Sequence, residues 1–352
     1  MDGPVAIVGG GIAGLSVAFT LCQRGVPVAV YDKAEFGRGT TWAAAGMLAP
    51  VNELEFQELD LLRLGQASLA LYPQWEALLG DIGLERTGTL EVALSPDDVP
   101  YLERLFQFQQ QQGLAVEWLS GTQLRAREPA LSPTLPAGVF APGDWQADNR
   151  KLVGALVGYL RAQGASLHPH TEVLGWAVAP GGISITTTSG TVAARALVLA
   201  TGAYPVPQPL GPPEAVKPIK GQMVALAPSG PQFGGLRHVV RIRSRAWGNA
   251  YLVPKTDRLV LGSTAEEVGA DRSLTAGGLL DVLRKAYAAV PGTYDLPILD
   301  LWTGHRPATA SRQPLVARHP TAPVVWLNGL YRHGVLLAPV VGQRACELLG
   351  LG

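Results

Sequence analysis

Three glycines near the start of the chain, Gly9, Gly11 and Gly14, constrain its fold more than any other feature. They follow the short apolar run 4–8, which predicts a buried parallel strand, and they open the apolar pattern 12–24, which predicts a helix. In this context the first glycine permits a tight turn, the second lets a pyrophosphate approach the backbone, and the third lets helix and strand pack closely. The helix N-terminus then favours the anion. The alternative is a glycine-rich turn in an ordinary α/β protein.

A carboxylate at the end of the second predicted strand, 26–32, supports a dinucleotide site. Asp32 lies 21 residues beyond Gly11, where it can accept hydrogen bonds from ribose hydroxyls. The motif alone does not separate NAD from FAD. The tight turn at 200–202 and the small residues 43–46 favour FAD, because both let backbone approach a flat, extended ligand, although a close helix crossing also explains 43–46. No second motif of this kind follows, so a flavin here would be reoxidised by oxygen, a quinone or a protein rather than by NAD(P).

Composition narrows the class of protein. The 352 residues carry 28 Lys and Arg against 28 Asp and Glu, and this zero net charge argues against a nucleic-acid or anionic-membrane binder. The 47% of apolar residues allows a substantial core. Cys22 and Cys346 form neither a disulfide framework nor a metal-ligand pattern, so we expect free thiols and no metal site. We find no segment that reads as a membrane span, and we expect a cytoplasmic protein.

Hydrophobic periodicity predicts the remaining elements. Further helices are expected at 53–79, 98–112, 150–163, 276–290 and 339–350. Further strands are expected at 165–168, 171–178, 183–188, 192–199, within 217–264, at 298–303 and at 323–328. The Pro-rich segment 203–216 marks a crossing between regions. Because strand-rich segments fall both between and after the nucleotide-type elements, we predict an α/β (α+β) fold of two interleaved domains. Our boundaries are 1–85, 145–215 and 300–352 for the FAD-binding domain, and 86–144 and 216–299 for the substrate-binding domain.

Six segments resemble the glycine/D-amino-acid oxidase family of flavoproteins. They are VAIVGGGIAGLSVA, TTWAAAGMLAP, VKPIKGQ, NAYLVPKTDRLVLGST, TGHRPATASRQPLVARHP and GLYRHGVLLAPVVG, and they run in order across nearly the whole chain. The resemblance implies a Rossmann-like FAD-binding domain interleaved with a substrate domain on a mixed, largely antiparallel sheet. It also implies a homo-oligomer. We expect FAD to be bound without a covalent link, because Cys22 lies in the first predicted helix and Cys346 in the last, beyond the segments that match near the flavin.

The resemblance implies catalytic roles for three residues. Tyr251 would hydrogen-bond the substrate carboxylate, Arg306 would pair with it, and Arg332 would lie beside the flavin and the pocket. An arginine fork suits this chemistry because it fixes the orientation of a carboxylate as well as its charge. Structural roles remain open: a surface cap or ion pair for Arg306, a strand core position for Tyr251 and an acid partner for Arg332. Pattern and resemblance together assign to the cofactor site Gly9, Gly11, Ile12, Ala13, Gly14, Asp32, Lys33, Thr40, Thr41, Ala44, Gly46, Met47, Leu48, Val173, Thr201, Gly202, Gly304, Arg306, Arg332, His333, Gly334, Val335 and Leu336.

Four positions depart from the family pattern. Leu330 and His333 replace a histidine and an asparagine near the flavin, Asn249 stands where a histidine is favoured, and Ala265 stands where a pocket methionine is expected. These changes could enlarge the pocket, alter which amine fits or weaken reactivity with oxygen. A surface histidine is the favoured interpretation of His333.

The resemblance is strongest to the family branch that oxidises glycine for thiamine thiazole synthesis. It implies hydride transfer from the α carbon of glycine to flavin N5, giving an imino acid and then glyoxylate, ammonia and hydrogen peroxide. Sarcosine and small D-amino acids are possible further substrates. The alternatives are a dehydrogenase that passes electrons to a quinone or a partner protein, and a non-catalytic flavin-binding subunit; an NAD-dependent dehydrogenase is a more distant reading.

A small basic cluster remains, comprising Arg237, His238, Arg241, Arg243 and Arg245. A solvated strand face is the favoured interpretation. A gate for an anionic substrate and an oligomer contact are the alternatives.

Overall fold

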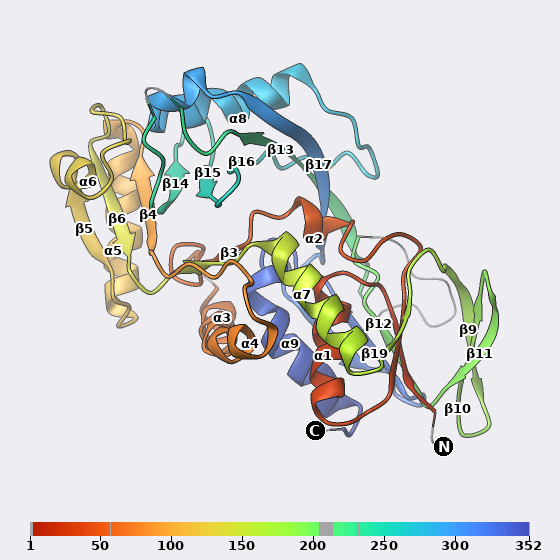
Figure 1. Ribbon diagram of the computed structural model, residues 1–352. Helices are drawn as coiled ribbons and strands as arrows, with labels where there is room; N and C mark the ends of the chain where they lie inside the picture. The colour runs from red at the N-terminus through yellow and green to blue at the C-terminus, as the bar shows by residue number, and fades with distance from the viewer. Residues whose placement is uncertain (1–2, 57, 204–213, 231–232, 352) are drawn as a thin grey trace.

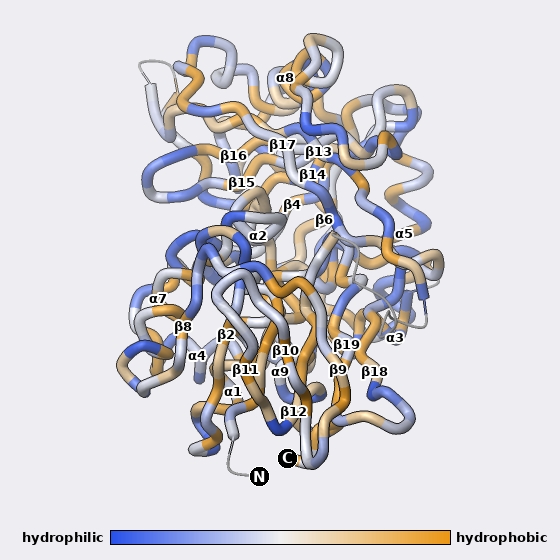
Figure 2. The backbone as a smooth tube through the Cα atoms, turned by 90° about the vertical axis from the view of Figure 1, so that its right-hand side faces the viewer, coloured by the Kyte–Doolittle hydropathy of each residue, from blue (hydrophilic) through white to orange (hydrophobic). Residues whose placement is uncertain are grey.

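The computed structural model describes residues 3–56, 58–203, 214–230 and 233–351. Most of the Pro-rich segment 203–216 therefore lies outside the described residues. Two large sheets organise the chain, with the eight-stranded sheet above the six-stranded sheet in the view of Figure 2. This mixed α/β architecture confirms the predicted fold class.

The six-stranded sheet carries the glycine-rich turn. Its order is β18-β19-β12-β1-β2-β8, and every pairing is parallel except β18 with β19. The strands are β18 (Leu315–Arg318), β19 (Val324–Asn328), β12 (Ala196–Leu199), β1 (Val5–Val8), β2 (Val28–Tyr31) and β8 (Ser166–His168). The predicted βαβ unit is confirmed, since helix α1 (Ile12–Gln23) links β1 to β2.

Both faces of this sheet are covered, which explains its continuous apolar strands. Val5 and Ile7 face a core that includes residues of α1, α7 (Asn149–Ala162) and α9 (Gly334–Leu348). Ala6, between them, faces the opposite side, where a three-stranded sheet packs. That sheet is β9 (Val173–Ala179), β10 (Gly182–Thr187) and β11 (Gly190–Ala194), on the right of Figure 1.

The eight-stranded sheet has the order β17-β13-β16-β15-β14-β4-β6-β5, with β14 and β4 parallel and the other pairs antiparallel. Its strands are β17 (Ile298–Ala308), β13 (Lys217–Leu226), β16 (Leu259–Gly262), β15 (Ala250–Pro254), β14 (Val239–Arg243), β4 (Thr89–Ala93), β6 (Ala137–Ala141) and β5 (Glu117–Ser120). One face packs on α8 (Ala276–Ala289), and the other carries Met223 and Trp302 toward the six-stranded sheet. The smaller elements are α2 (Thr40–Ala43), β3 (Met47–Leu48), β7 (Trp145–Gln146), α5 (Val99–Gln111), α6 (Gly121–Arg127) and the 3-10 turns Pro96–Asp98 and Pro291–Asp295.

The predicted helix 53–79 is wrong in two respects. The structure has α3 (Leu59–Leu69) and α4 (Tyr72–Leu79), separated by a break that precedes Pro73 in the first turn of α4. Proline suits that position because its missing N–H has no partner there. Of the predicted helix, the described residues 53–56 and 58 are not helical, because their polar groups bond to other parts of the chain, as described below.

The predicted last helix, 339–350, also begins too late. Helix α9 starts at Gly334 and contains Pro339. Proline cannot donate to the carbonyl four residues earlier, and this carbonyl, on Val335, instead accepts the hydroxyl of the fully buried Tyr72. A side chain from α4 thus satisfies the acceptor that Pro339 leaves open.

The predicted domain boundaries stay a prediction. The third FAD-binding segment was placed from residue 300 onward, and β17, which pairs within the eight-stranded sheet, spans that boundary. Across the described ranges, no helix has both the length and the apolar character needed to cross a membrane.

Candidate active site

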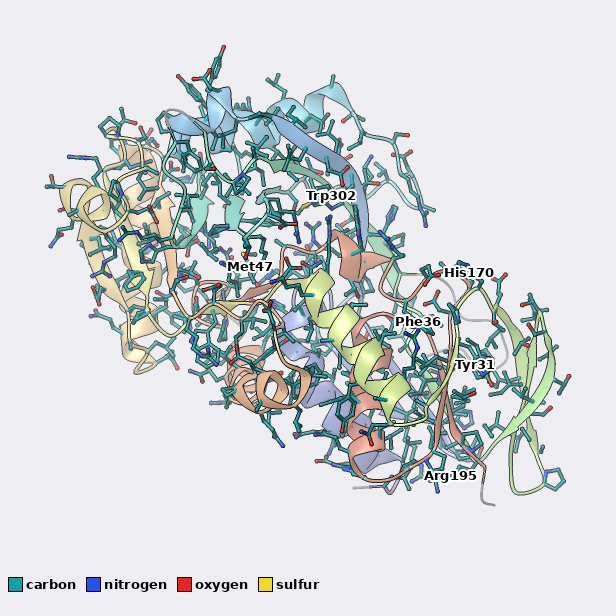
Figure 3. The ribbon with its side chains drawn as sticks, in the orientation of Figure 1. Tyr31, Phe36, Met47, His170, Arg195 and Trp302 are labelled. Carbon is teal, nitrogen blue, oxygen red and sulfur yellow. The ribbon has the colours of Figure 1, made fainter. Side chains whose placement is uncertain are left out.

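A cavity of about 1200 Å³ lies between the two large sheets. One wall comes from the carboxyl ends of β1, β2 and β19, where ligands bind in open α/β sheets. The other wall comes from β13, β15 and β17, and the cavity reaches α8 through Gly278 and Lys285. Figure 3 places Met47 between the sheets and Arg195 at the far end of the molecule.

The glycine-rich turn has the close contacts that the sequence predicts. Gly9 has φ +109°, and a Cβ there would lie 2.2 Å from the carbonyl oxygen of Ala200. A Cβ on Gly14 would lie 1.9 Å from the carbonyl oxygen of Gly9. The amide of Ile12, at the start of α1, donates to the hydroxyl of Thr41 (2.9 Å). These contacts leave no room for a side chain on Gly9 or Gly14, so the bare backbone of the turn faces the cavity, where a pyrophosphate needs space and backbone donors.

Asp32 is held at the cavity by two backbone amides. Its carboxylate accepts the amide of Gly10 (2.7 Å) and the amide of Ala34 (2.9 Å), and the residue lines the cavity. A carboxylate oxygen has more than one acceptor direction, so these bonds leave capacity for a ligand hydroxyl. The glycine-rich turn, the carboxylate of Asp32 and the cavity together fit FAD.

The segment 40–48 presses small residues against the cavity. Gly46 has φ +76°, and a Cβ there would lie 2.0 Å from the carbonyl oxygen of Ala147. On the other side, the indole of Trp302 donates to the carbonyl of Ala43 (3.1 Å). A Cβ on Gly304 would lie 2.4 Å from that of Ala43. Larger side chains in segment 43–46 would clash with Ala147 and with β17 and displace the segment, which is the physical reason for its small residues.

Arg306 and Tyr251 face the same cavity from β17 and β15. The Arg306 guanidinium lies over the backbone of Gly221, where an added Cβ would approach its atoms to 2.7 Å. It donates to the carbonyl of Thr264 (3.2 Å) and to the hydroxyl of Ser263. The Tyr251 hydroxyl donates to the sulfur of Met223 (3.3 Å), a weak acceptor that a ligand oxygen would readily replace.

Arg332 is paired with an acid. Its guanidinium lies 2.6 Å from a carboxylate oxygen of Glu58 and 3.0 Å from the carbonyl of Glu53, while the residue still lines the cavity. The neighbouring His333 is 4% exposed, so the surface interpretation of this residue is wrong. Its Nδ1 atom lies 3.4 Å from the carboxylate of Glu53.

The solvated-face interpretation of the basic cluster holds for Arg237 and Arg245, which are exposed, but it is wrong for two of its arginines. Arg241 and Arg243 are buried, with Arg241 3.3 Å from Glu53 and Arg243 2.7 Å from Glu91. Arg243 also lies 3.2 Å from Glu55. Although burial raises the pKa of Glu53, His333, Arg241 and Arg332 lower it overall to about 2. Glu53 and Glu55 therefore remain ionised beside the cavity. The ion pairs that these acids form with buried arginines take the place of the predicted helix.

The structure brings most of the predicted site residues to the cavity. Those on its wall are Gly9, Gly11, Ile12, Ala13, Asp32, Lys33, Thr40, Thr41, Ala44, Gly46, Met47, Val173, Thr201, Gly202, Tyr251, Gly304, Arg306, Arg332, Gly334 and Val335. Those beside it but off the wall are Gly14, Leu48, His333 and Leu336. Their individual roles stay predictions.

Several wall residues were not predicted, among them Glu53, Met223, Ser263 and Glu266, and Arg241 was named only as a member of the basic cluster. For Glu53 and Arg241 the sequence did contain a signal. Segment 53–58 carries three acids, and Arg241 and Arg243 recur at the spacing of one strand face. Complementary charge alone did not reveal that the two segments meet, because they are far apart in the chain.

Asp144 provides a test of the polar anchoring of segment 51–58. Its buried carboxylate accepts the amides of Val51 (3.0 Å) and Asn52 (2.9 Å), yet burial raises its pKa from 3.8 to about 7. The folded state then holds this proton more tightly than the unfolded chain, so its contribution to the free energy of unfolding falls as pH rises from about 4 to about 7. Between pH 4 and pH 7, the difference in free energy of unfolding between wild type and Asp144→Asn should change by up to about 4 kcal/mol. Urea unfolding followed by tryptophan fluorescence from pH 4 to 8 measures it, and a constant difference would contradict the argument.

Known proteins share this architecture. The family model described as DAO, FAD dependent oxidoreductase, matches residues 4–348. Glycine oxidase of Geobacillus kaustophilus is 32% identical, covering 98% of this chain and 92% of that protein. The bifunctional protein ThiO/ThiG of Trichormus variabilis is 31% identical, covering 99% of this chain and 53% of that protein, so this chain spans about half the length of that relative. The crystal structure of the Geobacillus glycine oxidase superposes with a TM-score of 0.89 at 31% identity, covering 99% of this chain and 94% of that one.

The match of the family model over almost the whole chain agrees with the glycine-rich turn, the fixed Asp32 and the cavity between the sheets. The chain therefore belongs to the DAO family of FAD-dependent oxidoreductases, and FAD is its cofactor.

Proposed function

We propose that this protein oxidises glycine, with sarcosine and small D-amino acids as further substrates and oxygen as the electron acceptor. The observation that carries the proposal is that Arg306 and Tyr251 line the same cavity as the small-residue segment 43–46. The relatives agree with it, since a protein that this chain matches over 92% of its length and a solved structure are both glycine oxidases.

Arg306 is suited to bind the substrate carboxylate. Its bonds go to neutral oxygens of Ser263 and Thr264, and within the described residues no carboxylate lies within 4 Å of it. Its charge is therefore available to a ligand, and a guanidinium binds a carboxylate through two parallel bonds that fix its orientation. The Tyr251 hydroxyl adds a directional bond without another full charge. FAD, when bound, supplies the two-electron acceptor.

The departures from the family pattern support a roomy pocket. Asn249 and Ala265 both line the cavity near Tyr251 and Arg306. A methyl group at position 265 occupies less space than the methionine that the resemblance favours there. Room beside the carboxylate site would accommodate an N-methyl group or a short side chain, which is why sarcosine and small D-amino acids belong to the proposal.

The bifunctional relative ThiO/ThiG suggests a biosynthetic pathway for the proposed reaction. In the bifunctional ThiO/ThiG protein, the half matched by this chain is joined to a further part. We propose on this basis that the imine or glyoxylate formed here serves thiamine thiazole synthesis. We further propose that the protein acts in the cytoplasm as a homo-oligomer.

Product analysis tests the proposed reaction. Holoprotein incubated with glycine in air should consume one oxygen and release one glyoxylate, one ammonia and one hydrogen peroxide per glycine. Sarcosine should yield methylamine in place of ammonia. Absence of oxygen consumption with every small amino acid, together with rapid reduction of an artificial dye, would contradict the oxidase and select the dehydrogenase.

A further inference from the structure

The strand next to that of Arg306 carries a second charged group, Lys220, which has no part in the proposed reaction. Lys220, on β13, is 1% exposed and does not line the cavity. Its ammonium lies 2.6 Å from Asp271, 3.0 Å from Glu266 and 3.2 Å from the carbonyl of Ser273. Burial of a lysine is costly unless its charge is compensated, so a fully paired lysine at this position calls for an explanation.

The acids that Lys220 holds belong to the same segment that holds Arg306. Segment 263–275 begins at Ser263 and Thr264, the two acceptors of the Arg306 guanidinium. It continues through Glu266, whose amide and carbonyl pair with the backbone of Lys220 (both 2.9 Å). It then crosses to the face of β13 opposite Arg306, where Lys220 and Gln222 point.

Glu266 is the acid that could interfere with substrate binding. It lines the cavity, as Arg306 does, and it lies two residues after the carbonyl that Arg306 binds. One carboxylate oxygen accepts the amide of Gln222 (2.9 Å) and the hydroxyl of Thr264, and the other faces Lys220. Released from these partners, Glu266 would be the nearest cavity-lining acid on this segment to offer Arg306 a carboxylate in place of the substrate's.

We propose that Lys220 is a positioning residue that holds Glu266 away from Arg306, so that the charge of Arg306 is left for the substrate carboxylate. Three features support this role together: the burial of Lys220, its bonds to the segment that orients Arg306, and the neutral character of the Arg306 partners. The inference rests on the proposed function, because it requires that Arg306 binds the substrate carboxylate.

Removing the lysine charge tests the proposal. In Lys220→Met the KM for glycine should rise about 10-fold or more while kcat stays within about twofold, because Glu266 then competes with the substrate. Lys220→Arg should retain most of the wild-type KM. The double variant Lys220→Met/Glu266→Gln should return KM to within about threefold of wild type, since the competing charge is gone. If Lys220 had a purely structural role, the further substitution Glu266→Gln would not lower the raised KM of Lys220→Met.

Binding of acetate to holoprotein, measured by calorimetry, gives a readout independent of turnover. Its Kd should follow the same order: raised in Lys220→Met and restored in the double variant. Lys151→Met is the matched control, because Lys151 is an exposed lysine paired with Asp81 (2.7 Å), and it should change neither constant. An unchanged acetate Kd in Lys220→Met, or a rise that Glu266→Gln does not relieve, would overturn the proposal.

Two further variants complete the test. If Lys220→Met does not fold, Thr264→Val removes another group that holds Glu266, and a smaller rise in KM, relieved by Glu266→Gln, is expected; no relief would overturn the proposal. Arg306→Lys separates the two hypotheses. If it leaves acetate binding unchanged, the proposed substrate site is wrong and the role of Lys220 falls with it. If it weakens binding while Lys220→Met does not, only the role of Lys220 is wrong.

Discussion

Replacement of Arg306 by alanine should raise the KM for glycine by about 100-fold or more while FAD remains bound. Two charge-assisted hydrogen bonds to a carboxylate contribute roughly 3 kcal/mol or more together, and each 1.4 kcal/mol is a factor of ten in affinity. FAD binding should persist because, among the residues that the structure describes, the side chain bonds only to Ser263 and Thr264. Steady-state kinetics and the visible absorption spectrum of the purified variant measure the two effects.

The control for Arg306→Ala is Arg344→Ala. Arg344 is exposed on α9 and pairs with Glu347 three residues later, so its loss should leave KM unchanged. Equal KM values in Arg306→Ala and wild type would remove Arg306 from the substrate site. Loss of FAD from Arg306→Ala would instead show that the guanidinium supports the cofactor rather than the substrate.

Replacement of Gly14 by alanine should prevent the protein from retaining FAD. The new Cβ would lie 1.9 Å from the carbonyl oxygen of Gly9, so the start of α1 or the turn must move. The turn has little freedom, because a side chain on Gly9 would in turn meet Ala200. We expect at least a 100-fold weaker FAD affinity and a lower melting temperature, measured by fluorescence titration of the apoprotein and by thermal unfolding.

Gly154→Ala provides the matched control for Gly14→Ala. Gly154 is exposed within α7, and a Cβ there would meet no atom within 4 Å. The same substitution should therefore leave FAD binding unchanged and stabilise the helix by up to about 1 kcal/mol. Retention of normal FAD affinity by Gly14→Ala would contradict the close approach of helix and strand on which the cofactor assignment depends.

Local sequence rules predicted the elements whose cause is local. The first βαβ unit was predicted within two residues at each end, because apolar period, glycine turn and chain polarity agree there. The predicted helices 150–163 and 276–290 correspond to α7 and α8. Both helices begin after a side chain that caps them, Asp148 and Thr275.

The sequence did not reveal features whose cause lies far away in the chain. Strands β4, β5 and β6 were not predicted; β4, for instance, takes its place between β14 and β6, far from it in sequence. The start of the predicted helix 53–79 has the apolar spacing of a helix. Its acids Glu53 and Glu55 instead form ion pairs with the buried arginines of β14, which a helix at this place would not explain. Pro339 predicts the start of a helix, but it lies inside α9, because the distant Tyr72 donates a hydrogen bond to the carbonyl of Val335 that Pro339 leaves without a partner.

The candidate site divides in the same way. The glycine turn, Asp32 and the small-residue segment were recognisable because each carries its constraint in its own sequence. The partners of Arg306 and the cluster around Lys220 were not, because they depend on which face of β13 and β17 each side chain occupies. Resemblance to a family supplied Arg306 and Tyr251, and the structure adds the residues that hold them in place.

Anaerobic titration of the holoprotein with glycine, followed by admission of air, tests the central claim most directly. We expect glycine to bleach the visible absorption of the bound flavin, and air to restore it with formation of one hydrogen peroxide per flavin. The substrate and the acceptor are then established in a single experiment. Failure of glycine, sarcosine and small D-amino acids to bleach the flavin would contradict the account, and bleaching that air does not reverse would contradict the assignment of oxygen as the acceptor.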